Sequence, residues 1–386
     1  MGSAIDYGTF SRSSSGIKKA MSSKGALHIP QRHRSCMQKL GWEAVVKSPH
    51  FYEDRRKLCI SQQFICLIEF RTYGDGYFLF AQEFVITVHD PVQGTWEELP
   101  RLPRGIPDRF RCVCVNLKLL LIGGRNSNYV ERQYSVFIYD FSSAKWSRGT
   151  DCPLETVDAA CSVSAEGVVY VAGRMDSNDN AVRGAAVYNV EKDEWKLLPH
   201  MNQKWDHCFG TFIDGKFTVI DGHSAPWVKR SKANAEVYDP EKGAWYTLQD
   251  VWNGQHPRPF HFPHAIECVG NPLYRFQTQQ GMNVYDSKAN VWRSVTSLPQ
   301  TLPKIACCTA WRDGIFVGVN VEGTYPNDFF RPLRHYAFYM LRPQCVERGA
   351  VASEGEMVGE WCPIPVRMPQ DPSVDYQLLS AVTVEI

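Results

Sequence analysis

Residues 119–146 read LLLIGGRNSNYVERQYSVFIYDFSSAKW and contain the three markers that decide the fold: a glycine pair, a Tyr-Asp pair and a tryptophan. The tyrosine precedes the tryptophan by seven residues, and four other segments keep this spacing, with His replacing Tyr in the first. The five tryptophans are 50, 49, 50 and 47 residues apart: Trp96, Trp146, Trp195, Trp245 and Trp292. Gly124, Gly173 and Gly222 end β-rich runs at intervals of 49. Two independent markers with one period predict an internal repeat of about fifty residues.

Each period is expected to form four short strands. In the unit that holds the quoted stretch they are predicted at 111–115, 117–122, 135–139 and 145–148, separated by turn residues. One four-stranded sheet cannot cover both of its faces, whereas sheets arranged radially bury each face against a neighbour. The recurring Tyr and Trp supply large apolar contacts between sheets, and the small glycine allows a tight turn near the crowded axis. The predicted fold class is therefore all-β, a six-bladed β-propeller.

The two ends of the repeat region are irregular. Before Trp96 the sequence shows two strand-like runs without a clear innermost strand, at 64–70 and 84–89. After Trp292 the last blade is expected at 306–311, 314–319, 335–339 and around Trp361, with a polar insertion at about 342–359. The strand-like run Tyr376–Ile386 has no blade of its own. We therefore expect it to complete the first blade, which closes the ring without an unpaired edge.

Composition and charge exclude several classes of protein. The chain has 386 residues, of which 44% are hydrophobic, and 42 Lys+Arg against 41 Asp+Glu give a net charge of +1. No apolar run approaches the roughly 18 residues needed to cross a bilayer, so no membrane partner is expected. The 13 cysteines include no CxxC pair and follow no secretory signal, which favours reduced thiols in the cytosol or nucleus. Residues 1–60 are basic, but we do not expect a nucleic-acid partner.

The fifty-residue unit with its Gly pair, Tyr-Asp and Trp resembles the kelch repeat. The resemblance spans residues 64–386, although the glycine pair is intact only at Gly123-Gly124 and becomes Ala172-Gly173 and Asp221-Gly222. Kelch propellers are mostly interaction modules, with a minority of enzymes such as galactose oxidase. The resemblance therefore implies a protein that binds another protein.

Upstream, Arg34–Leu58 reads RSCMQKLGWEAVVKSPHFYEDRRKL and is similar to the second half of an F-box. The combination resembles the plant F-box/kelch class, whose members are substrate receptors of SCF ubiquitin ligases. The resemblance implies that a Skp-type adaptor binds the apolar side chains of this segment: Leu40, Trp42, Val45, Val46, Phe51 and Tyr52. It also suggests a metabolic enzyme or a hormone-response regulator as the target.

The expected layout is a disordered basic tail at 1–27, a partial F-box-like helical segment at 28–60 and the propeller at 61–386. An F-box usually opens with a Leu-Pro-containing helix, and nothing between Met1 and Pro30 supplies one. A kelch adaptor or decoy that no longer engages the ligase core therefore stays open as an alternative. A propeller enzyme or small-molecule specifier is the third possibility.

Loops from successive blades converge at the face of a propeller, where binding residues are expected. The residue after each repeat's glycine, and the loops that enter the same blades, supply the candidates for partner binding: Arg109, Arg125, Asp158, Arg174, Trp205, Asp206, His207, His223 and Trp227. Two guanidiniums and an imidazole on one rim can bind carboxylates, and an exposed Trp often anchors an interface. The alternative is that these side chains only bond neighbouring carbonyls.

Nothing in the sequence indicates catalysis. His256, His261 and His264 in HPRPFHFPH match no recognised zinc spacing, and no Ser/His/Asp set or carboxylate pair stands out. Asp140 and its equivalents, Asp239 and Asp286, recur because they turn the chain between strands. We expect no catalytic residue, no bound metal and no cofactor.

Overall fold

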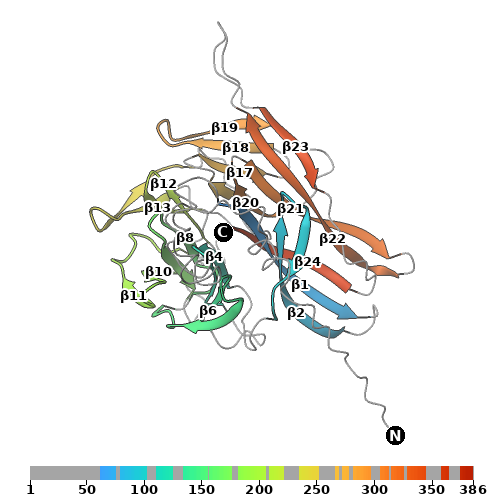
Figure 1. The fold of residues 1–386 in the computed structure, drawn as a ribbon. Helices are drawn as coiled ribbons and strands as arrows, with labels where there is room; N and C mark the ends of the chain where they lie inside the picture. Colours follow the sequence, from blue (N-terminus) through green and yellow to red (C-terminus); the bar gives the residue numbers. More distant parts are fainter. Residues whose placement is uncertain are drawn as a thin grey trace, which may run out of the picture.

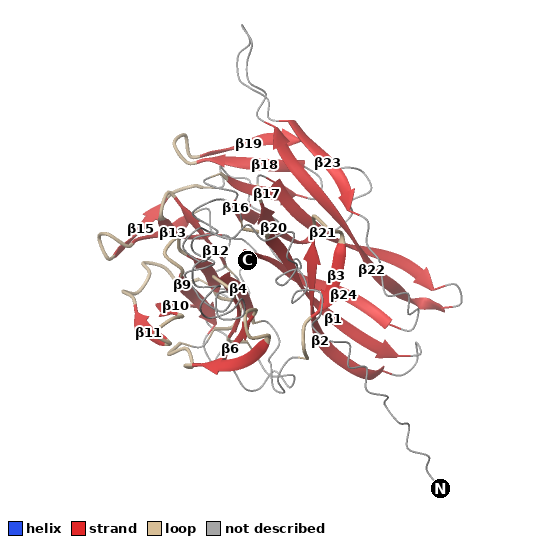
Figure 2. Ribbon diagram, viewed as in Figure 1, coloured by secondary structure: helices blue, strands red, loops and turns tan. Residues whose placement is uncertain are grey.

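The computed structural model describes residues 61–74, 79–101, 110–124, 134–154, 156–175, 181–205, 208–220, 234–251, 266–268, 272–277, 281–296, 305–312, 314–325, 328–344, 358–364 and 374–385. These residues form 24 strands in six four-stranded antiparallel sheets, arranged as blades around a common axis (Figures 1 and 2). Within these ranges no helix has the length and apolar character that would let it cross a membrane. The predicted six-bladed propeller is confirmed.

The first three blades, each read from the axis outward, have the following strands. Blade 1 consists of β24 (Val374–Glu385), β1 (Gln63–Gly74), β2 (Leu79–Asp90) and β3 (Thr95–Glu98). Blade 2 consists of β4 (Arg111–Val115), β5 (Lys118–Ile122), β6 (Val136–Asp140) and β7 (Lys145–Gly149). Blade 3 consists of β8 (Ala160–Val163), β9 (Val168–Met175), β10 (Ala181–Asn189) and β11 (Glu194–Leu197).

The other three blades repeat the pattern. Blade 4 consists of β12 (Phe209–Ile213), β13 (Lys216–Ile220), β14 (Ala235–Asp239) and β15 (Ala244–Leu248). Blade 5 consists of β16 (Ile266–Cys268), β17 (Leu273–Gln277), β18 (Gly281–Asp286) and β19 (Val291–Thr296). Blade 6 consists of β20 (Ile305–Trp311), β21 (Gly314–Tyr325), β22 (Asp328–Gln344) and β23 (Val358–Ile364). The four strands predicted for blade 2 agree with the structure to within a residue or so.

The ring closes through the C-terminal strand, as predicted. Strand β24 pairs antiparallel with β1 from Gln63 opposite Glu385 to Tyr73 opposite Val374. It occupies in blade 1 the position that β4 occupies in blade 2. Because β24 pairs with β1, the inner edge of β1 is not left unpaired. The first and last strands of the propeller in chain order are thereby hydrogen-bonded to each other.

Apolar side chains fill the space between neighbouring blades. Leu67 of β1 packs with Phe316 and Phe338 of blade 6, whereas Ile68, one residue later, packs with Leu119 of blade 2. All five of these side chains are buried. Alternation along each strand thus covers both faces of a blade, which explains why a single blade cannot be stable alone.

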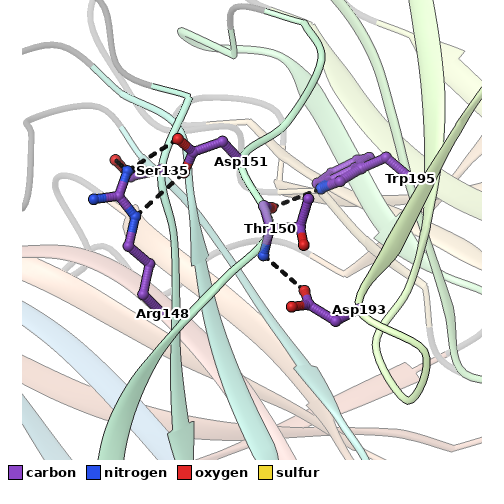
Figure 3. Close-up of polar contacts among 6 residues, drawn as sticks. All are labelled: Ser135, Arg148, Thr150, Asp151, Asp193 and Trp195. Carbon is purple, nitrogen blue, oxygen red and sulfur yellow. Dashed lines mark hydrogen bonds and ion pairs between the residues drawn. The ribbon is translucent and has the colours of Figure 1, made fainter.

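The tyrosine and tryptophan of each repeat lie opposite each other on the two outer strands. Tyr188 pairs with Trp195 across β10 and β11, and their ring centroids are 4.6 Å apart. The indole Nε1 of Trp195 also donates a hydrogen bond of 2.9 Å to the carbonyl oxygen of Thr150, at the exit of blade 2 (Figure 3). The Thr150 amide donates in turn to Asp193 Oδ1 at 2.7 Å. The aromatic pair therefore packs within its own blade and bonds to the preceding one.

The same indole bond recurs around the ring. Its acceptors are carbonyl oxygens at the exits of blades 1, 3 and 4: Pro100 for Trp146 at 3.1 Å, Pro199 for Trp245 at 2.8 Å and Val251 for Trp292 at 3.0 Å. Because the indole N–H of one blade bonds a backbone carbonyl of the preceding blade, this bond holds each outer strand relative to its neighbour. The repeated Tyr and Trp predict the aromatic contacts, whereas no residue pattern in the sequence indicates this polar link.

The aspartates after each tyrosine turn the chain, as predicted. Asp140 Oδ1 accepts hydrogen bonds from the amides of Ser142 at 2.7 Å and Ser143 at 3.1 Å. Corresponding side chains accept equivalent bonds in the other turns: Asp90, Asn189, Asp239 and Asp286. These bonds are local to the turn, which assigns the aspartates a structural role.

The glycine pair lies where two blades approach closely. Gly123 has a φ of 68°, and a Cβ built on it would lie 1.7 Å from Thr156 Oγ1 at the entrance to blade 3. The amide of Gly124 donates to the carbonyl of Thr156 at 3.0 Å. A side chain at Gly123 is therefore excluded both by space and by backbone conformation.

Candidate protein-binding face

The two faces of the ring differ in the length of the segments that connect the strands there. At one end, called the turn face here, β4 passes into β5 through residues 116–117 and β6 into β7 through residues 141–144. At the other end, called the loop face, Arg111 pairs with Ile122, and the chain continues into the longer segments before β4 and after β5. Segments flanking these two strands therefore leave the blade from the same end.

The chain enters and leaves the propeller at the turn face. Gln63, at the start of β1, pairs with Glu385, at the end of β24. Ser61 Oγ donates to Glu385 Oε1, and Gln62 Nε2 donates to Asp90 Oδ2 at 3.0 Å. The first 60 residues consequently connect to the side opposite the loop face. The adaptor-binding candidates lie outside the described residues: Leu40, Trp42, Val45, Val46, Phe51 and Tyr52.

Three of the nine predicted partner-binding residues are described. Asp158 precedes β8, is half-buried and has a φ of 53°. The backbone of Arg174 lies in β9 opposite Val182. The remaining six lie outside the described residues, and their role stays a prediction: Arg109, Arg125, Asp206, His207, His223 and Trp227.

The burial of Trp205 contradicts its predicted role as a partner-binding residue. Its side chain is fully buried and packs with Ala172 of blade 3 and Phe217 of blade 4. Its amide donates to the carbonyl of Val182 at 3.1 Å. Trp205 is therefore part of the core between two blades and not an exposed anchor for a partner.

The structure shows a cation at the loop face that the sequence analysis did not single out. Arg111, the first residue of β4, donates from Nε to the carbonyl of Ala159 at 2.6 Å and from Nη2 to the carbonyl of Cys208 at 3.4 Å. Ala159 lies just before β8 of blade 3, and Cys208 just before β12 of blade 4. Backbone groups of two further blades thus hold this guanidinium near the axis. Its sequence signal is an arginine at the first position of an innermost strand.

Three phenylalanine rings pack against one another at the boundary of blades 1 and 2. Phe70 and Phe84 pair across β1 and β2, with ring centroids 5.0 Å apart. Phe110, which precedes Arg111, approaches Phe84 edge-on at 5.6 Å. All three side chains are half-buried. They form an aromatic cluster that joins the two blades.

An ionic cluster stiffens blade 1 near the same face. Arg71 bonds Glu69 at 3.0 Å and Glu98 at 2.7 Å, and Thr87 Oγ1 donates to the other oxygen of Glu69 at 3.0 Å. Burial by itself lowers the pKa of Arg71, but the charges of Glu69 and Glu98 outweigh burial and raise that pKa above its usual value. The guanidinium stays charged, and the cluster as a whole joins β1, β2 and β3.

Four of the described thiols are poorly suited to nucleophilic chemistry. Burial raises the pKa of both Cys161 and Cys307 to about 12, and it raises the pKa of Cys112 and Cys114 well above the ordinary value. Protonated thiols are weak nucleophiles and weak metal ligands. Within the described ranges, no group of three or more His, Cys, Asp or Glu is placed to hold a metal ion. His256, His261 and His264 lie outside those ranges.

Comparisons with known proteins agree with the geometry. The Kelch motif family matches residues 108–153, which is the second repeat. F-box/kelch-repeat protein At2g44130 of Arabidopsis thaliana is 25% identical over 61% of this chain and 65% of its own length. F-box/kelch-repeat protein SKIP20 of the same plant is 26% identical over 61% of this chain and 66% of its own length. The match thus spans about two thirds of these relatives.

Among solved structures, the chain titled "Structure of YjhT" aligns with a TM-score of 0.49 at 12% identity, over 66% of this chain and 88% of that chain. That likeness is too distant to bear on function. The repeat markers, the closed ring of six blades, the matched motif and the Arabidopsis relatives point to one conclusion: this chain is a six-bladed β-propeller that carries a kelch motif and is similar to plant F-box/kelch-repeat proteins.

Proposed function

We propose that this chain is a non-catalytic substrate-recognition subunit of an SCF-type E3 ubiquitin ligase, acting in the cytosol or nucleus. The observation that carries the proposal is the separation of the two faces. The segment that resembles an F-box enters at the turn face, where Gln63 pairs with Glu385, while the longer loops leave from the opposite face. Relatives with the same repeats are named F-box/kelch-repeat proteins.

The mechanism is proximity. A Skp-type adaptor binds the F-box-like segment, and a target protein binds the loop face. Holding the target beside the ubiquitin-charged enzyme raises its effective concentration there, so the propeller needs no reactive group of its own. The buried, protonated thiols support this role. A metabolic enzyme or a hormone-response regulator is the kind of target that the family resemblance suggests.

A binding assay with a purified Skp-type adaptor tests the proposal. The full chain should retain the adaptor, and Trp42→Ala together with Val46→Ala should abolish retention, because these residues supply the apolar seam of the F-box-like segment. Leu197→Ala is the matched control, since Leu197 is 59% exposed on an outer strand of the propeller. A folded chain that does not retain the adaptor would instead support the decoy.

A further inference from the structure

We propose that the contact between blades 6 and 1 is sensitive to protons: in mild acid, protonation of His89 opens this contact before the contacts between the other blades. The contact is called the closing seam below, and its aromatic part consists of His89 and Trp96 of blade 1 with Phe316 and Phe338 of blade 6. The inference concerns the ring itself and does not depend on the proposed ligase role.

His89 occupies a position that belongs to tyrosine in the next four repeats: Tyr139, Tyr188, Tyr238 and Tyr285. It pairs with Trp96 across β2 and β3, and the two rings are stacked with centroids 4.0 Å apart and planes 18° apart. Phe316 of blade 6 lies 6.4 Å from the imidazole. Because an imidazole titrates near neutral pH and a phenol does not, blade 1 alone of these five repeats has a group here that gains charge in mild acid.

The imidazole is buried with one nitrogen bonded. His89 is 1% exposed, and its Nδ1 donates to the carbonyl of Thr95 at 3.1 Å. Its Nε2 is buried and has no hydrogen-bond partner among the described residues. Protonation therefore adds an N–H without an acceptor and a positive charge inside an apolar contact. An opened seam, in which water reaches Nε2, is the better environment for the protonated ring.

Charged side chains of blade 1 do little to stabilise that proton. Asp90 follows His89 at the end of β2, and the ionic cluster around Arg71 lies farther along the strands toward the loop face. Burial lowers the pKa of His89, and the Thr95 carbonyl and the charge of Asp90 oppose this only in part. The closed seam consequently favours the neutral ring.

The titratable and charged groups on the blade 6 side do not neutralise a positive charge either. Cys307 and Cys362 belong to or pack against the apolar cluster of the seam, and burial raises the pKa of Cys307 to about 12. Arg312 lies over Trp311 of the same cluster, with its guanidinium carbon 4.7 Å from the ring centroid. A protonated thiol is neutral, and a guanidinium repels an imidazolium.

The outer half of the closing seam lacks the indole bond that holds the other outer strands. Trp96 Nε1 is buried without a partner among the described residues, whereas the next four repeat tryptophans each donate to the preceding blade. Polar bonds hold the inner half instead, where Trp311 Nε1 donates to the carbonyl of Gln63 at 3.3 Å. The outer half thus depends on the aromatic stack, which is where the proton adds its charge.

The direction of the pH effect follows from linkage. The pKa of His89 is below the ordinary 6.5 in the closed seam and returns toward 6.5 when the seam opens. Above about pH 6.5 the ring is neutral in both forms and the seam stays closed. As the pH falls below this value the open form binds the proton more tightly, so its population rises until the pKa of the closed form is passed.

Two half-buried thiols of the chain report where opening occurs. Cys362 of β23 packs against the closing seam, and Cys161 of β8 packs between blades 2 and 3. The full chain is treated at pH 7.5 and at pH 5.5 with a pyridyl disulfide, which reacts with thiols in mild acid, and the labelled peptides are quantified by mass spectrometry. The ratio of Cys362 to Cys161 labelling should rise about twofold or more at the lower pH. A ratio is used because both thiols meet the same reagent.

Histidine variants connect the response to one side chain. His89→Tyr installs the residue of the other repeats and should hold the labelling ratio constant between the two pH values. If His89→Tyr does not fold, His89→Phe replaces it, because this smaller ring also removes the titration. His200→Tyr is the matched control, since His200 is exposed just after β11, and it should respond as the parent chain does.

Three results would each overturn the proposal. The ratio stays constant in the parent chain, the rise persists when His89 is replaced, or labelling of Cys161 rises as much as that of Cys362. The last result would mean that acid loosens the whole ring and not the closing seam. None of these outcomes bears on the adaptor assay, which is carried out at neutral pH.

Discussion

The indole of Trp195 in blade 3 donates a 2.9 Å hydrogen bond to the backbone carbonyl of Thr150, which belongs to blade 2. Trp195→Phe keeps an aromatic ring beside Tyr188 but removes this donor. We expect the free energy of unfolding to fall by about 1–3 kcal/mol, from the lost hydrogen bond and the smaller ring. Urea denaturation measures this change. Tyr246→Phe, at a 39% exposed position of blade 4, is the control and should have almost no effect.

Deleting residues 374–386 should destabilise the whole propeller. Strand β24 is the inner partner of β1 along its length, and its residues Ala381 and Val384 are buried. Without them the innermost edge of blade 1 is exposed and the ring is open. Thermal melting followed by circular dichroism should show one transition at a clearly lower temperature. An unchanged melting temperature would contradict closure by this strand.

Gly123→Ala should cost much more than Gly215→Ala. Both glycines have a positive φ, 68° and 74°, so each substitution introduces backbone strain of about 1 kcal/mol. At Gly215 nothing lies within 4 Å of the added Cβ, whereas at Gly123 the new atom collides with Thr156 at 1.7 Å. Equal losses of stability in the two variants would mean that the approach between blades 2 and 3 is not tight.

Replacing Arg71 tests the ionic cluster. Glu69 is only 2% exposed, so Arg71→Met leaves a buried carboxylate without its cation and should cost about 3–5 kcal/mol. Arg148→Met removes an ion pair whose partners are 59% and 50% exposed, and its cost should stay below about 1 kcal/mol. Denaturation of both variants at one pH and salt concentration gives the comparison.

His89 should make the propeller less stable in mild acid. Its ring stacks on Trp96 at 4.0 Å, and its Nδ1 donates to the carbonyl of Thr95 at 3.1 Å. Burial lowers the pKa of His89 below the ordinary 6.5, although Thr95 and Asp90 oppose this. The unfolded chain therefore binds the proton more tightly, so stability is full above about pH 6.5 and declines below it, until the folded pKa is passed.

His89→Phe removes this titration and keeps a ring on Trp96. Its free energy of unfolding, measured at steps between pH 7.5 and pH 5 or so, should vary less than that of the parent chain over the same interval. Two parallel curves would show that His89 does not contribute to the acid sensitivity.

Local patterns were sufficient to predict much of the fold. The apolar alternation of residues 111–122 defines β4 and β5, and the strand-like run from Tyr376 had no other place in a closed ring than blade 1. Asp140 could be assigned to a turn because its bonds are made within the next three residues. These features depend on chain segments that are close in sequence or on the count of blades.

The candidate site was harder to predict, because exposure depends on a neighbouring blade. Trp205 lies in a loop segment, but the space between Ala172 and Phe217 buries it. Arg111 was overlooked because its acceptors, Ala159 and Cys208, are backbone carbonyls, which any residue type provides. The carbonyls that receive the indole bonds likewise belong to Pro, Thr and Val, so no residue type reveals them.

The pairing of Gln63 with Glu385 has a consequence for biosynthesis. Translation delivers β1 before the other five blades and its inner partner β24 after them, so the first sheet of the nascent chain is incomplete until β24 has been made. During that interval the inner edge of β1 has unpaired backbone groups that can pair with other strands. Synthesis of β24, and not the making of any single blade, is therefore the step that allows the toroid to close.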